Sequence, residues 1–196
     1  MRHSKSGFPL LLTERLQLRE PLLSDCGDFH EVLQFPEVTR FSDWPDAPTI
    51  AQTERSLKWM CTAFAKGKGC AWVIEDRISG RLLGTIRFNR IDNHSRWAEV
   101  GYETHPSVWG RGFMTEAVKA VTRCGFDGFS LNRIEAWTLP GNVASDRVLE
   151  KAGFRYEGTL YQKAWFKNAF HDFRMFGCLA SEAPISTQNP YRPSKN

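Results

Sequence analysis

Alternating apolar and polar residues mark seven short stretches of this chain and predict β-strands. In the first, residues 15–19, Leu16 and Leu18 would face a core while their polar neighbours face outward. Turn-forming residues at 78–81 and 92–94 separate three of the later stretches, which favours consecutive antiparallel strands. The other six predicted strands are residues 70–75, 82–91, 97–104, 133–139, 154–166 and 171–179.

Four other segments have apolar residues at helical spacing. Ser24 and Asp25 resemble a helix cap before the first of them, and Thr49 precedes the second. Gly153 follows the last one, as glycine does at the end of a helix. Residues 36–49 contain three prolines and predict an irregular loop. The predicted helices begin after Asp25 and then span residues 50–65, 112–126 and 144–152.

The order of these elements, β-α-α-β-β-β-α-β-α-β-β, predicts the fold class. It is an α/β (α+β) fold with a single mixed, mostly antiparallel sheet of about seven strands flanked by four helices. A doubly wound parallel sheet is excluded because three consecutive strands have no helix between them. We expect one domain over residues 10–180, with loose termini at 1–9 and 181–196.

Composition and cysteine usage place the chain among ordinary globular proteins. Of 196 residues, 41% are hydrophobic and 24% are charged. The apolar runs are too short to cross a bilayer, and residues 1–9 lack the apolar stretch of a signal peptide. We therefore expect a cytoplasmic protein with no membrane partner. Five cysteines are scattered without Cys-x-x-Cys or zinc-site spacing, so we expect reduced thiols and no metal.

The net charge of +4 is spread along the chain and is not gathered in a basic block. A weak positive charge is compatible with an acidic cofactor or a position near the ribosome. Direct nucleic-acid binding is not expected, because such proteins concentrate their basic residues in a patch.

Residues 100–117 carry the clearest chemical signal, since a strand there leads through a glycine-bearing loop into a helix. Gly110 and Gly112 allow backbone N–H groups to turn toward a ligand, and the helix start adds further unpaired N–H groups. Arg111 places a basic side chain between the two glycines. The segment therefore predicts a phosphate-binding loop.

Two common phosphate motifs do not fit this loop. A P-loop is excluded because the chain has no G-x-x-x-x-G-K-[ST] sequence. A dinucleotide-binding turn requires Gly-x-Gly-x-x-Gly directly after the strand, whereas Thr115 occupies the third glycine position. Residues 106–109 also separate the strand from the glycines.

The segment 109–114 resembles motif A of the GCN5-related N-acetyltransferase (GNAT) family, Arg/Gln-x-x-Gly-x-Gly/Ala after a strand and a His-Pro pair. Residues 142–154 resemble the Asn-x-x-Ser helix of the family with its Lys-x-Gly-Phe end. Together with residues 13–19 and 84–90, they are similar to the RimJ/RimL-like branch, which acetylates ribosomal-protein N-termini. The resemblance covers about residues 10–180.

This resemblance implies the GNAT fold and acetyl-CoA as co-substrate. The loop would bind the pyrophosphate, and the end of the preceding strand, splayed from its neighbour, would bind the pantetheine arm. Motif A departs from the family at its ends, where Trp109 replaces Arg/Gln and Met114 replaces Gly/Ala. The expected cofactor-binding residues are Tyr102, Glu103, Thr104, Trp109, Gly110, Arg111, Gly112, Phe113, Met114, Asn142 and Ser145.

Two residues are candidates for catalysis. Glu103, beside the expected thioester, would be the general base, with a solvent-facing strand residue as the alternative reading. Many relatives have a tyrosine at the position of Leu149 to protonate the departing thiolate, so here Ser145 is the candidate acid. Ser145 could instead only cap its helix. His105 and His171 are further titratable groups.

The resemblance implies an acetyl-CoA-dependent N-acetyltransferase whose acceptor is a primary amine, most simply the N-terminal amine of a (ribosomal) protein. An α-amine has a reference pKa of about 7.7–8.0, against about 10.4 for lysine, so it is easier to deprotonate. The alternatives are acetylation of a small amine (an aminoglycoside, polyamine or amino acid) and a non-catalytic acyl-CoA-binding module. Phe41 and Trp44 are expected to wall the acceptor pocket. Relatives are monomers or homodimers, and the same is expected here.

Overall fold

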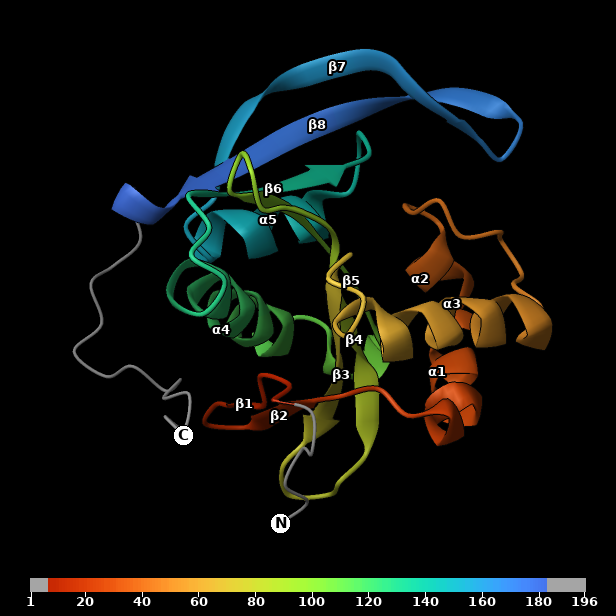
Figure 1. Cartoon of the computed structure of the whole chain (residues 1–196). Coiled ribbons are helices and arrows are strands. Elements are labelled where there is room, and N and C mark those ends of the chain that lie inside the picture. The colour runs from red at the N-terminus through yellow and green to blue at the C-terminus, as the bar shows by residue number, and fades with distance from the viewer. Residues whose placement is uncertain (1–6, 183–196) are drawn as a thin grey trace.

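The computed structural model describes residues 7–182, in which one sheet separates two groups of helices (Figure 1). The strands are β1 Leu11–Leu12, β2 Leu16–Arg19, β3 Cys70–Asp76, β4 Leu82–Asp92, β5 Trp97–Thr104, β6 Arg133–Thr138, β7 Arg155–Phe166 and β8 Ala169–Leu179. The helices are α1 Cys26–Leu33, α2 Pro36–Thr39, α3 Ile50–Ala63, α4 Phe113–Asp127 and α5 Val143–Lys151. Short 3-10 turns lie at Leu23–Asp25, Pro106–Val108 and Ala180–Glu182.

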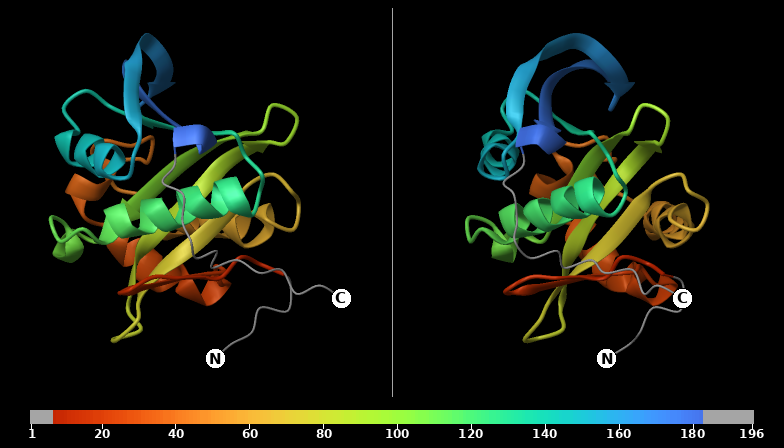
Figure 2. Two further views of the ribbon diagram at one scale, coloured as in Figure 1. Left: turned by 90° about the vertical axis from the view of Figure 1, so that its left-hand side faces the viewer. Right: turned by 60° about the vertical axis from the view of Figure 1, so that its left-hand side comes forward.

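The predicted mixed, mostly antiparallel sheet is confirmed, with strand order β1-β2-β3-β4-β5-β6-β8-β7. Every neighbouring pair is antiparallel except β5 and β6, which run parallel. Helices α4 and α5 lie on one side of the sheet and α1–α3 on the other (Figures 1 and 2). The β7–β8 hairpin extends the sheet as a curved two-stranded ribbon, which Figure 1 shows arching above the remaining strands.

All seven predicted strands form, and residues 7–182 contain one more strand and one more helix than predicted. The extra strand, β1, has only two residues, too few to show an alternating pattern. The extra helix, α2, lies inside the segment predicted as an irregular loop. Pro36 stands at its first turn, where a proline nitrogen loses no hydrogen bond, so the proline that suggested a loop instead begins a helix.

The boundary predicted at residue 10 is also wrong by two residues. Phe8 is buried and packs edge-on against Phe64 and Trp72. The carbonyl of Pro9 accepts a hydrogen bond from the Trp72 indole at 2.7 Å. Residues 8 and 9 are therefore part of the fold and not of a loose terminus. Residues 1–6 and 183–196, in the predicted termini, lie outside the described residues.

Each face of the sheet buries its own apolar core. The larger core joins the sheet to α4 and α5, and the smaller one joins it to α1 and α3. Strand β3 is covered on both faces, which explains its unbroken run of five buried residues. In contrast, β6 alternates strictly between half-buried and buried positions. Thr49 caps α3 as predicted, because its hydroxyl accepts the Gln52 N–H.

Gly84 permits the close approach of β4 and β5 where the sheet meets the candidate site. Its φ of +153° is unfavourable for other residues, and a Cβ there would overlap the Glu103 carbonyl oxygen and lie 2.8 Å from the Thr104 Cα. The substitution Gly84→Ala should therefore lower the free energy of unfolding by about 3 kcal/mol or more. Urea denaturation measures this change.

Gly27→Ala is the matched control, since Gly27 lies in α1 and a Cβ added there would meet no packed neighbour within 4 Å. That variant should be neutral or stabilised by up to about 1 kcal/mol. Equal stability of the two alanine variants would contradict a steric role for Gly84.

Candidate active site

A slot opens where β5 and β6 part. The two strands pair only over Trp97–Glu99 with Arg133–Glu135, and from Val100 onward β5 is paired with β4 alone. Within residues 7–182, the β6-facing edge of Val100–Thr104 therefore has no partner strand. The splayed strand that the sequence resemblance implied is present. An extended chain with amide groups could pair with this edge as a strand does.

The glycine loop directly after the slot presents a row of N–H groups. Gly110 and Gly112 have φ values of +71° and +81°, the left-handed conformation that glycine adopts without strain. Gly112 is the N-cap of α4, and the first N–H bonded back to it is that of Glu116. Within residues 7–182, the N–H groups of Gly110–Thr115 have no hydrogen-bond partner. This geometry suits a diphosphate.

The two departures from motif A leave these N–H groups accessible. The Trp109 indole Nε1–H donates to the carbonyl and the hydroxyl oxygen of Thr104, at 3.0 and 3.2 Å. Trp109 therefore fastens the loop to the end of β5. Met114 is only 9% exposed and packs in the larger core, so its side chain points away from the loop.

Arg15, which precedes β2, braces the loop from the other side. Its guanidinium donates to the Arg111 carbonyl at 2.9 Å and stacks 4.1 Å above the Phe113 ring. It also pairs with the Glu116 carboxylate in the first turn of α4, at 2.7 Å. This pairing neutralises an acid that would otherwise repel an anion at the helix N-terminus.

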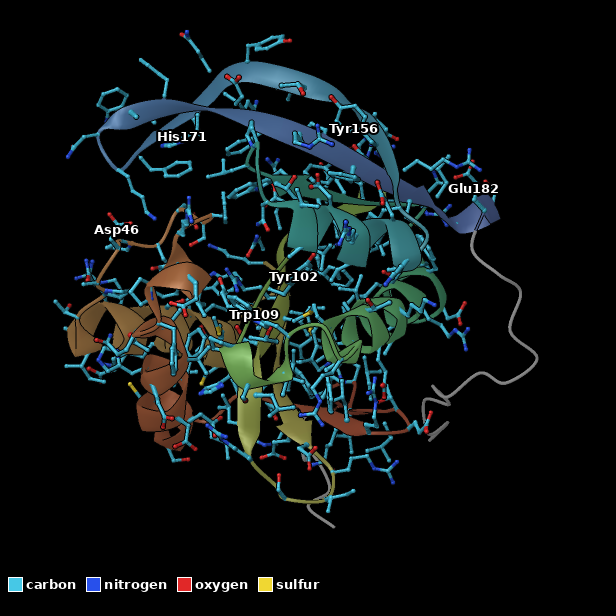
Figure 3. All side chains as sticks on the ribbon, turned by 180° about the vertical axis from the view of Figure 1, so that it is seen from behind. Asp46, Tyr102, Trp109, Tyr156, His171 and Glu182 are labelled. Atoms are coloured by element: carbon cyan, nitrogen blue, oxygen red, sulfur yellow. The ribbon has the colours of Figure 1, made fainter. Side chains whose placement is uncertain are left out.

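The hydroxyl groups of Tyr102 and Ser145 meet in the slot, 2.8 Å apart. Figure 3 shows Tyr102 near the centre of the molecule, above Trp109. Burial raises the pKa of the Tyr102 phenol above its ordinary value, so at neutral pH this group keeps its proton. The structure thus places a phenol beside Ser145, the candidate acid. Leu149, at the position where many relatives have a tyrosine, is buried in the core.

Ser145 is held in place from two sides. The side-chain oxygen of Asn142 caps α5 by accepting the Ser145 N–H at 3.2 Å. Next to it, Asp146 accepts hydrogen bonds from Thr138 at 2.7 Å and Arg174 at 3.1 Å. These contacts fix the first turn of α5 against β6 and β8. They leave the Asn142 amide N–H groups and the Ser145 hydroxyl as polar groups beside the slot.

Glu103 lies beside the slot but is almost fully buried, at 6% exposure. Its carboxylate accepts hydrogen bonds from Arg87 at 2.5 and 2.8 Å, from Trp44 at 2.9 Å and from Thr85 at 3.1 Å. Burial opposes ionisation, but the Arg87 charge and these hydrogen bonds outweigh it and hold the pKa of Glu103 below its usual value. This environment makes the carboxylate a weaker base than a free glutamate.

A shallow depression lies between the segment that follows α2, the turn after β6 and the β7–β8 hairpin. Its lining residues are Arg40, Phe41, Leu139, Pro140, Phe170, His171 and Asp172. Lys167 at the hairpin tip bonds the Thr39 carbonyl at 2.8 Å and Asp46 at 2.7 Å, so the hairpin is fastened to the loop that follows α2. Figure 3 shows His171 and Asp46 on these facing segments.

Phe41 lines this depression, whereas Trp44 does not. The Trp44 ring is buried against Phe29 and acts on the site through its bond to Glu103. The two candidate histidines make local contacts: His105 accepts the Ser107 N–H at 3.1 Å, and His171 lies 3.0 Å from the Phe166 carbonyl.

The sequence did not reveal the side-chain roles of Tyr102, Arg15 and Asp146. Tyr102 was expected to contribute its backbone edge, yet its hydroxyl reaches a residue 43 positions away. Arg15 and Glu116 are 101 positions apart. Such pairings depend on the tertiary fold, and no local pattern signals them. Within residues 7–182 there is also no cluster of metal-ligating side chains and no helix long and apolar enough to span a membrane.

Comparisons with known proteins agree with this geometry. A family model described as an acetyltransferase (GNAT) domain matches residues 15–155. The uncharacterized N-acetyltransferase YoaA of Bacillus subtilis (strain 168) is 33% identical over 172 residues, covering 88% of this chain and 97% of that protein.

Two solved structures share the fold. A GNAT-family acetyltransferase from Bacillus anthracis superposes with a TM-score of 0.80 at 25% identity, over 89% of this chain and 100% of that one. RimL, a ribosomal L7/L12 alpha-N-protein acetyltransferase in complex with coenzyme A, gives a TM-score of 0.78 at 20% identity, over 87% of this chain and 97% of that one.

The family model spans most of the chain, and the relative from Bacillus subtilis is similar over nearly the whole of it. The chain therefore belongs to the GNAT family and is an N-acetyltransferase with acetyl-CoA as its co-substrate.

Proposed function

We propose that the amine acceptor is the N-terminus of a protein, of the kind that RimL acetylates. The proposal rests on the depression between α2 and the β7–β8 hairpin, which we take as the acceptor site. This depression is open to solvent, and its lining contains aromatic side chains and a single carboxylate, Asp172. Asp172 already accepts the Gln162 N–H at 2.8 Å, and Arg40 lines the same depression. A site for a polycationic small amine would need an excess of free carboxylates.

The cofactor would bind across the loop and the slot. The N–H groups of Gly110–Thr115 hold the pyrophosphate, with Arg111 as the adjacent cation. The free edge of Tyr102–Thr104 pairs with the pantetheine amides, and the Asn142 side chain adds a donor near the thioester. A backbone N–H of β5 stabilises the oxyanion that forms during attack.

In the reaction, the amine nitrogen attacks the thioester carbonyl carbon, the C–S bond breaks and the coenzyme A thiolate leaves. Ser145 donates its proton to the thiolate. Tyr102 in turn donates to Ser145, because the two hydroxyls are within hydrogen-bond distance. The amine nitrogen loses one proton to water as the amide forms, and water returns one proton to Tyr102, so the proton balance closes. A phenol has a reference pKa near about 10, so it is a better ultimate proton source than an aliphatic hydroxyl.

Glu103 serves this site as an ionised anchor and not as the general base that the sequence suggested. Protonating it would break its pairing with Arg87, which is itself buried and cationic. An α-amine with a pKa of about 7.7–8.0 is partly neutral at physiological pH and needs little help to lose its proton. The Glu103–Arg87 ion pair instead holds β5 and Trp44 in place beside the slot.

The acceptor is tested by incubating the protein with acetyl-CoA and a matched panel of amines. The panel contains a lysine-bearing peptide, the same peptide with a blocked N-terminus, and spermidine. We expect thiol release with the free peptide only, and mass spectrometry should locate the acetyl group on its α-nitrogen. Faster turnover of spermidine, or acetylation of lysine in the blocked peptide, would show that the acceptor is a different amine.

Ser145→Ala should lower kcat by about 100-fold, in the usual range for losing a general acid. Tyr102→Phe should lower kcat less, because the serine hydroxyl remains. Calorimetry should find the coenzyme A Kd nearly unchanged in both, since neither hydroxyl is needed to hold the diphosphate. An equal loss of kcat and of coenzyme A affinity would make the hydroxyl pair a binding feature and not a proton donor.

Glu103→Gln should lower the free energy of unfolding at neutral pH by about 3–5 kcal/mol, because it leaves the Arg87 charge buried and unpaired. The pKa of Glu103 is lower folded than unfolded, so its stabilisation is present above its unfolded pKa and is lost as the pH falls through its folded pKa. The stability difference from the wild type should therefore shrink below about pH 4.

The double variant Glu103→Gln/Arg87→Met removes both charges and should be more stable than Glu103→Gln alone.

The pH profile of kcat/KM distinguishes the two roles considered for Glu103, an ionised anchor and a general base. If Glu103 is an anchor, kcat/KM of the Glu103→Gln variant should still rise with pH as the substrate amine loses its proton. If kcat/KM of Glu103→Gln no longer fell at low pH, Glu103 would instead be the general base.

A further inference from the structure

We propose that Arg40 selects acceptors that carry an acidic side chain at the second or third residue of the protein N-terminus. The proposal rests on the proposed function, because it assigns a specificity to the same acceptor depression. Arg40 lines this depression and is exposed. Within residues 7–182 its guanidinium has no hydrogen bond and no ion pair, so its charge is available to a ligand.

The backbone around Arg40 is held in a fixed place. The residue before it, Thr39, is fully buried, and the Thr39 hydroxyl lies 3.3 Å from the Pro36 carbonyl and 3.2 Å from the Asp46 carbonyl. The Thr39 carbonyl accepts a hydrogen bond from Lys167 of the hairpin at 2.8 Å. The Arg40 N–H donates to the Pro36 carbonyl at 2.9 Å. The side chain of Arg40 therefore starts from a point that is set relative to both walls of the depression.

The aromatic ring of Phe41 is a platform for the guanidinium. The Arg40 Cζ lies over this ring, 5.1 Å from its centre. The stacking restricts a long side chain that would otherwise be mobile in solvent, and it leaves the N–H groups of the guanidinium free. These N–H groups form a planar fork that matches the two oxygens of a carboxylate. The expected ligand of Arg40 is therefore a carboxylate.

The Phe41 ring also connects Arg40 with the start of α5. A Cβ added at Gly141 would lie 3.6 Å from the ring, so the ring packs directly against this glycine. Asn142, the next residue, caps the helix turn that carries Ser145. Two contacts, of 3.6 and 5.1 Å, thus separate the guanidinium from the start of α5. An extended peptide advances about 3.3–3.6 Å per residue, so its second or third side chain reaches Arg40 when its amine lies beside Ser145.

The neighbouring charges leave Arg40 as the cation that a ligand would meet. Lys167 pairs with Asp46 at 2.7 Å, so these two charges cancel. The one carboxylate of the lining, Asp172, accepts the Gln162 N–H at 2.8 Å and is thereby turned toward β7. A basic side chain of the acceptor would meet Arg40 as a like charge, whereas an acidic one would be attracted to it.

Steady-state kinetics with matched peptides tests the proposal. The peptides share one lysine-free sequence with an amidated C-terminus, and they differ in one residue, Asp, Asn or Arg, placed second, third or sixth. With Asp second or third, the wild type should show a kcat/KM about fivefold above that for Asn, the effect of one partly screened ion pair. Arg at these positions should lower kcat/KM. Asp in the sixth place should give no preference, because it lies beyond the reach of Arg40.

Two substitutions and one control assign the preference to Arg40. In Arg40→Gln the preference for Asp over Asn should fall below about twofold, and in Arg40→Glu the order should reverse in favour of the Arg peptides. Arg55→Gln is the matched control, since it removes the same charge from an exposed arginine of α3 that does not line the depression. It should keep the full preference. Each preference is a ratio measured on one variant, so a general loss of activity cancels.

Equal turnover of Asp and Asn peptides by the wild type, the same preference at the sixth residue, or an unchanged preference in Arg40→Gln would overturn the proposal. The result also separates this proposal from the proposed function. Acetylation of the peptide α-nitrogens without a preference for acid would contradict only the role of Arg40. A lack of α-nitrogen acetylation in every peptide would contradict the proposed acceptor as well.

Discussion

The structure depends on the early parting of the two parallel strands, β5 and β6. Three paired positions hold them together, and beyond these the backbone edge of β5 is unpaired. An unpaired edge beside a core is costly unless a ligand or water satisfies it, so the fold retains a binding slot where a continuous sheet would have none. Other elements stabilise the strands beside the slot. Helices α4 and α5 pack against the sheet in the larger core, and every residue of β6 pairs with β8.

Two networks of charge keep the edges of the slot in position. On one face, Glu103 and Arg87 link β5 to β4 and to the loop that contains Trp44. At the phosphate loop, Arg15 links the chain before β2 to the start of α4. In each network an arginine cancels the charge of an acid, and the acid of the second, Glu116, lies in the first turn of α4, where an anion is expected. An anion is favoured at the start of α4 because the nearby Glu116 carboxylate is neutralised, as well as because positive charge is present.

The sequence predicted most of the fold and about half of the site. Alternation and helical spacing located seven strands and four helices, because each of these buries one face. The two-residue β1 and the four-residue α2 were missed, since neither is long enough to show a period. The glycine loop and the helix start after it were readable because they form a local motif. The Tyr102–Ser145 and Arg15–Glu116 contacts were not, because they join distant segments. The sequence placed Glu103 beside the slot, but only the structure shows its four hydrogen bonds.

The Lys167 contacts with Thr39 and Asp46 hold the tip of the β7–β8 hairpin in place. A two-stranded ribbon projecting from a sheet is marginally stable by itself. Here β7–β8 is supported at both ends, by β6 at its base and by Thr39 and Asp46 at its tip. Phe170 and His171, near the tip, are thus held at a set separation from Phe41. The lining of this depression is therefore preorganised, and the entropy of ordering the hairpin is lost during folding and not when a ligand binds.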